Sequence, residues 1–87
     1  MSKRDLYELS IEAVEMCAPT ATPIRNKLNR VLARSEDPKL REIIEVLLRQ
    51  HQFASHTPAI PISGMSRCRD TAAELLGYCR SQLERYS

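Results

Sequence analysis

The segment 37–53, DPKLREIIEVLLRQHQF, is the most apolar and most regular stretch of the chain, and it restricts the fold more than any other. Asp37 stands where a helix N-cap is expected, and Pro38 occupies the first helical position that proline favours. The apolar side chains that follow recur at helical spacing and cover one broad face, together with a histidine at its end: Leu40, Ile43, Ile44, Leu47, Leu48 and His51. We therefore expect a helix over about residues 38–53 that forms the core against which the rest of the chain packs.

Three further segments have the periodicity of amphipathic helices, at about residues 3–17, 23–34 and 67–86. Strands have little support, because the chain holds two glycines and no NG or DG turn beside an alternating β-branched run. A length of 87 residues provides material for one core. The sequence predicts a single all-α domain spanning residues 1–87, built as a small bundle of three to four helices.

Helix boundaries are marked by capping residues. Ser2 with Asp5 three positions later has the pattern of a capping box, and Thr22 precedes Pro23 at the start of the second helix. Ser66 is the expected cap of the last helix, whose apolar face is predicted to extend to its end at Tyr86. The short link of residues 35–36 predicts that the second and third helices are neighbours, as an antiparallel hairpin or as a steep helix-turn-helix corner.

Residues 54–66 carry Pro58 and Pro61 separated by apolar residues, which predicts an extended crossover before the last helix. No segment approaches the roughly 20 apolar residues that cross a bilayer. The N-terminal region has acids within its apolar pattern, unlike a signal peptide. We expect no membrane contact and a cytoplasmic location.

Cysteine and histidine positions do not suggest chemistry. Cys17, Cys68 and Cys79 have no CxxC spacing and are expected to be small buried apolar residues in a reducing compartment. His51 and His56 lack the paired spacing of metal ligands, and no phosphate-binding loop or nucleophile motif is present. We expect no catalytic residues, no metal and no cofactor, so an enzyme is not indicated.

Four apolar residues lie off the main helix faces in two heptad-spaced pairs, Leu9 with Met16 and Val46 with Phe53. A helix in a small bundle normally buries one stripe, and positions beyond it are polar. Two interpretations remain open. The crossover and the last helix cover the two pairs, or the pairs form an interface with a partner protein or with a second copy in a homodimer.

The second helix carries positive charges alone: Arg25, Lys27, Arg30 and Arg34. Such side chains hold phosphates in DNA and RNA, although the next helix presents a mixed face that suits DNA poorly. The alternative is that these cations pair with the acidic stripe Glu8, Glu12 and Glu15 of the first helix. The 13 basic and 11 acidic residues nearly balance, which excludes a histone-like polycation and an acidic mimic of nucleic acid.

From the sequence we expect a small regulator or adaptor that is not an enzyme and that binds a protein partner through its helix faces, with a homodimer as one form of it. The alternative hypothesis is a small regulator that binds DNA or RNA through the second helix.

Overall fold

The computed structural model describes residues 2–16, 22–51 and 68–86 of the chain, without the side chain of His51. These residues form four α-helices and no strand: α1 (Lys3–Glu15), α2 (Thr22–Arg34), α3 (Pro38–His51) and α4 (Arg69–Glu84). The prediction of a small all-α bundle is confirmed. The predicted crossover of residues 54–66, and the last residues expected in the first and third helices, lie outside the described residues.

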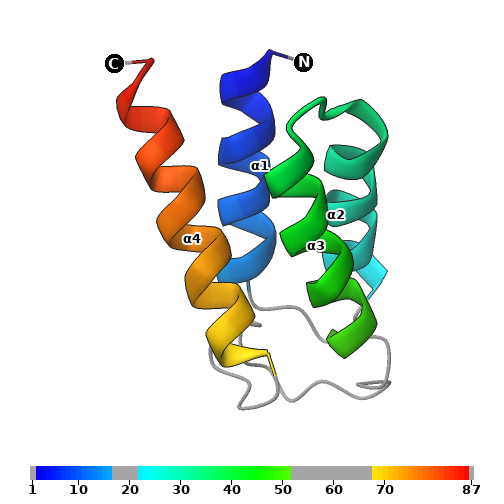
Figure 1. Ribbon diagram of the computed structural model, residues 1–87. Helices are drawn as coiled ribbons and strands as arrows, with labels where there is room; N and C mark the ends of the chain where they lie inside the picture. The colour runs from blue at the N-terminus through cyan, green and yellow to red at the C-terminus, as the bar shows by residue number, and fades with distance from the viewer. Residues whose placement is uncertain (1, 17–21, 52–67, 87) are drawn as a thin grey trace.

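Successive helices run in opposite directions, and both chain ends lie at the same end of the bundle (Figure 1). The helix α1 packs between α2 and α4, while α3 packs against α2 and α4 on the other side. The link of residues 35–37 turns the chain so that α2 and α3 lie side by side and antiparallel (Figure 1). Of the two expected arrangements of this pair, the structure therefore shows the hairpin.

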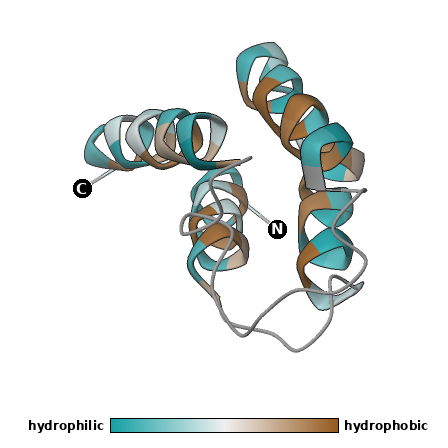
Figure 2. Ribbon diagram, turned by 90° about the horizontal axis from the view of Figure 1, so that it is seen from below, coloured by the Kyte–Doolittle hydropathy of each residue, from teal (hydrophilic) through white to brown (hydrophobic). Residues whose placement is uncertain are grey.

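The core takes apolar side chains from all four helices. Brown in Figure 2 marks the hydrophobic residues of each helix, and teal marks the hydrophilic ones. The largest fully buried aliphatic side chains are Ile24, Leu28, Leu40, Ile44, Leu47 and Leu75. Three of these belong to α3, so the role expected for the segment 37–53 is confirmed in its described part. Each such side chain contributes about 1.5–3 kcal/mol to stability through its removal from water.

The predicted capping box at the start of α1 is present. The Ser2 hydroxyl accepts a hydrogen bond from the Asp5 backbone N–H at 3.2 Å. The Asp5 carboxylate in turn accepts one from the Ser2 backbone N–H at 3.1 Å. These two bonds satisfy donors that the first turn of a helix leaves unpaired, which explains why the helix begins at Lys3.

Two side chains fix the turn between α2 and α3. The Asp37 carboxylate accepts hydrogen bonds from the backbone N–H groups of Lys39 and Leu40, at 3.0 and 3.3 Å, and so caps α3 as expected. The guanidinium of Arg41 donates to the carbonyl oxygens of Leu32 and Ser35, where α2 ends. The carbonyls at the end of one helix and the amides at the start of the next are thus both satisfied by side chains.

The last helix differs from its prediction at both ends. It begins at Arg69, and Cys68 occupies the N-cap position without a side-chain capping bond, whereas the expected cap Ser66 lies outside the described residues. It ends at Glu84 rather than at Tyr86. Because Tyr86 follows the helix, it leaves the apolar face assigned to it and is 44% exposed.

Candidate functional site

A groove of about 590 Å³ runs between α3 and α4 on the outside of the bundle, and we call it the α3–α4 groove. It is lined by residues of both helices: Pro38, Lys39, Glu42, Ile43, Val46, Thr71 and Glu74. Ile43 is 5% exposed and Val46 is half-buried, so these two side chains provide an apolar floor. Val46 is therefore the one residue of the four predicted interface positions that lines a groove in the described part of the chain.

Four acids lie on or near this groove. Glu42 and Glu74 line it, and Glu45 and Asp70 are exposed on the same two helices. Within residues 2–16, 22–51 and 68–86, none of these four carboxylates forms an ion pair. The lysine of the lining, Lys39, places its Nζ 5.2 Å from the centre of the Tyr78 ring, where it makes a cation–π contact. The rim of the α3–α4 groove consequently carries negative charge.

The acidic stripe of α1 is, by contrast, matched by cations. Glu8 pairs with Arg4 at 3.1 Å within the helix. Glu12 pairs with Lys27 of α2 at 3.1 Å, and Glu15 pairs with Arg80 of α4 at 3.4 Å. These contacts lie at the surface and add little stability, but they compensate the charge of α1 locally. The expected pairing of the α1 acids with the α2 cations is thus observed at one pair, Glu12 with Lys27.

The predicted nucleic-acid residues of α2 occupy different environments. Lys27 is held by Glu12, with 28% of its side chain exposed, and Arg25 is half-buried. Arg30 and Arg34 are exposed and form no ion pair in the part of the chain that the structure describes. Of the four basic residues of α2, Arg30 and Arg34 are therefore the two that are exposed, one turn apart.

The other predicted interface residues are placed as follows. Leu9 is 8% exposed and belongs to the core, and Met16 is half-buried and packs against the core. Leu9 lies in α1 and Met16 is its C-cap. Phe53 lies outside the described residues. The interface role of these residues stays a prediction, and neither Leu9 nor Met16 is among the residues that line the groove around Val46.

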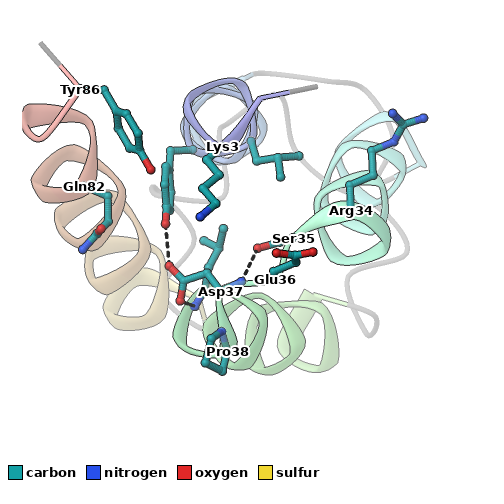
Figure 3. Close-up of a pocket in the computed structure, with 11 residues that line it drawn as sticks. Lys3, Arg34, Ser35, Glu36, Asp37, Pro38, Gln82 and Tyr86 are labelled. Carbon is teal, nitrogen blue, oxygen red and sulfur yellow. Dashed lines mark hydrogen bonds between the residues drawn. The ribbon is translucent and has the colours of Figure 1, made fainter.

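A polar cluster that the sequence did not reveal joins three helices, and we call it the Asp37 cluster. The hydroxyl of Tyr7 in α1 donates to Asp37 Oδ2 at 2.6 Å, and that of Tyr78 in α4 donates to the same oxygen at 2.5 Å. Asp37 itself stands at the start of α3 (Figure 3). No local sequence pattern predicts this contact, because Tyr7 and Tyr78 are 30 and 41 residues from Asp37.

Ionisation of the cluster follows from its hydrogen bonds. Burial acts to raise the pKa of Asp37, but the bonds donated by the two tyrosines and by two backbone N–H groups outweigh it and lower the pKa below 3.8. Burial, followed by the bond to Asp37, raises the pKa of Tyr78 to about 12. The same two causes raise the pKa of Tyr7. At neutral pH the cluster therefore holds one carboxylate and two neutral phenols.

A cleft of about 530 Å³ lies beside this cluster, between the start of α1, the α2–α3 link and the end of α4. In Figure 3, Lys3 reaches over it, with Tyr86 on one side and Arg34 on the other. The ring centre of Tyr86 lies 6.4 Å from that of Tyr7. Since the Asp37 carboxylate is already saturated by donors from the protein, this end of the molecule functions as a junction between helices.

The two described cysteines lie in the core of the bundle. Cys68 and Cys79 are buried, and burial is the main cause that raises the pKa of Cys79 to about 12. A thiol with so high a pKa is a poor nucleophile. No group of three potential metal ligands occurs within residues 2–16, 22–51 and 68–86. Cys17 and His56 lie outside these ranges, as does the side chain of His51.

Comparisons with protein-family models, with curated proteins and with solved structures find no match of any kind. Among the described helices, none has the length and apolarity needed to cross a membrane. Among the described surfaces of this chain, the α3–α4 groove is the strongest candidate for a functional site.

Proposed function

We propose that this protein is a small regulator or adaptor without catalytic activity, and that it acts by docking a protein partner in the α3–α4 groove. The observation that carries the proposal is the groove itself, an outer cavity of about 590 Å³ with an apolar floor at Ile43 and Val46. Concave surfaces with apolar centres and polar rims are typical of sites where a partner inserts anchoring side chains.

The remaining apolar residues support this choice. Most large apolar side chains of the described ranges, including that of Leu9, lie in the core of the bundle. Val46, unlike Leu9, is half-buried and lies at the floor of a groove that α3 and α4 form together. A partner that covers Val46 removes apolar surface from water, which favours association. A homodimer is one form of such a complex, and a different protein is the other.

Capture of partners from a native lysate tests the proposal. Val46→Asn replaces the floor residue by a polar one of similar helix propensity, and Ala33→Asn makes an exposed change on α2 as a matched control. We expect proteins that wild type and Ala33→Asn retain and that Val46→Asn loses, while far-ultraviolet circular dichroism shows all three chains folded. Equal retention by all three folded chains contradicts the groove as the binding surface.

Nucleic-acid binding is the second candidate, supported by the exposed Arg30 and Arg34 without ion-pair partners in the described chain. Two or three phosphate contacts from one helix give a weak and salt-sensitive site. Treating the lysate with nuclease separates the candidates, because protein docking survives it. Replacement of Lys27, Arg30 and Arg34 together by glutamine abolishes retention of nucleic acid if this candidate is correct, and leaves the Val46-dependent proteins bound.

A further inference from the structure

The charges around the α3–α4 groove identify the kind of partner that fits it. Resting on the proposed docking function, we infer that the occupant is an amphipathic helix whose apolar stripe is flanked by lysine or arginine. Its apolar side chains cover Ile43 and Val46, and its cations reach the carboxylates on both sides of the groove. Glu42 lies on the α3 side and Glu74 on the α4 side, so one basic helix meets both.

The contrast between the two acidic surfaces carries this inference. Three glutamates of α1 each have a cation within 3.4 Å that the same chain supplies. The four acids on and beside the groove have none among the described residues. Lys39 also lines the groove and keeps its charge in the contact with the Tyr78 ring, so the lining holds one cation against the two carboxylates of Glu42 and Glu74. A basic partner supplies the charges that are absent here, and opposite charges across an interface speed association and fix orientation.

The shape of the site favours a helix over an extended strand. The groove is formed by two neighbouring helices, and a third helix packs into such a groove with its ridge of apolar side chains. An extended peptide gains its affinity mainly from backbone bonds to a sheet edge, and residues 2–16, 22–51 and 68–86 contain no strand to offer one. Long basic side chains on the edges of a docked helix also cover apolar surface with their stems.

A second copy of the chain fits the groove less well. A two-fold dimer built on this surface places the same patch of both copies face to face. Two surfaces that each carry more acids than cations then meet, and like charges across an interface oppose association. The charge pattern therefore selects a different, basic chain over self-pairing at the groove.

Three synthetic peptides of about 18 residues test the inference on the isotope-labelled full chain by nuclear magnetic resonance. They share a leucine and alanine stripe and carry lysine, glutamine or glutamate on the polar face. We expect the lysine peptide to shift the amide signals of Ile43, Val46 and Thr71 in a saturable way. The double variant Glu42→Gln with Glu74→Gln weakens its binding about 5- to 10-fold, and salt raised from about 0.05 to 0.5 M has a similar effect.

The matched control removes two acids from α1 instead, through Glu8→Gln with Glu12→Gln, and leaves the affinity within about twofold. Equal weakening by both double variants shows non-specific attraction and overturns the inference. Saturable shifts at the groove with the glutamine or glutamate peptide alone overturn the basic partner but keep the docking function. Shifts that depend on protein concentration without peptide show a second copy as occupant. If no peptide moves the groove signals and Val46→Asn loses no captured protein, the docking function fails as well.

Discussion

Replacement of Asp37 by asparagine isolates the tertiary role of this residue from its role as a helix cap. Asparagine caps helices about as well as aspartate, so the bonds to the start of α3 survive. The change removes the negative charge and replaces the acceptor oxygen of the two tyrosine bonds by an amide N–H₂. The hydroxyls can then only accept from the amide, so the bonds that remain are neutral. We therefore expect the variant to fold with α3 intact but with a weaker junction between α1, α3 and α4.

The expected loss follows from two hydrogen bonds. A bond to a charged group contributes about 1.5–3 kcal/mol, against about 0.5–1.5 kcal/mol for a neutral one. Converting both tyrosine bonds from charged to neutral therefore costs about 2 kcal/mol of unfolding free energy. Asp37→Ala loses the helix cap as well, which adds about 1 kcal/mol. The difference between the two variants measures the cap together with the neutral bonds that asparagine keeps, and the loss in the asparagine variant measures the contribution of the carboxylate charge to the cluster.

Urea unfolding followed by circular dichroism at several pH values provides the measurement. The pKa of Asp37 is lowered in the folded state, so its stabilisation is fully present above 3.8 and is lost as the pH falls through the folded-state value. The gap in unfolding free energy between wild type and Asp37→Asn should be widest near neutral pH and should narrow below about pH 3.8. A gap under about 0.5 kcal/mol at neutral pH, or one that stays constant through acid, refutes this account of the cluster.

Three further outcomes are expected. Gly77→Ala should raise the unfolding free energy by about 0.8–1.0 kcal/mol, because a Cβ at this helical position meets no atom within 4 Å; an unchanged urea midpoint contradicts this. Above pH 10 the unfolding free energy of wild type should fall as the pH rises, because the phenols of Tyr7 and Tyr78 ionise at a lower pH in the unfolded chain than in the folded one. In urea unfolding, Tyr78→Phe should show a smaller fall over the same pH range. Arg41→Gln should lower the unfolding free energy by about 1–2 kcal/mol through loss of its bonds to the end of α2, whereas Arg49→Gln on the exposed face of α3 should change it little in the same assay.

Helix starts were predictable because their causes are local. Ser2 and Asp5 accept hydrogen bonds from each other's backbone N–H, and Asp37 accepts from those of Lys39 and Leu40, all within three residues, so the pattern is visible in the sequence. The Asp37 cluster was not predictable, because its tyrosines reach Asp37 only after distant helices have packed. The same residue thus has one role that the sequence shows and another that depends on the tertiary fold.

The burial of Leu9 shows where the sequence rule of one apolar stripe per helix fails. The helix α1 packs against both α2 and α4, so it buries a wider arc than a helix with one neighbour. The position of Val46 was identifiable as an apolar residue off the main face of α3. The groove around it was not, since its opposite wall comes from α4, which lies beside α3 only in the folded bundle.

The packing of α1 against α4 also sets an order of events during synthesis of the chain. Glu15 and Arg80, which pair across these helices, are 65 residues apart, and closing so long a segment costs more entropy than forming the α2–α3 hairpin. A ribosome adds roughly 5–20 residues per second, so several seconds pass between the emergence of α1 and that of its neighbour. Throughout that interval the apolar side of α1 has no α4 to cover it, and apolar surface exposed in this way favours aggregation.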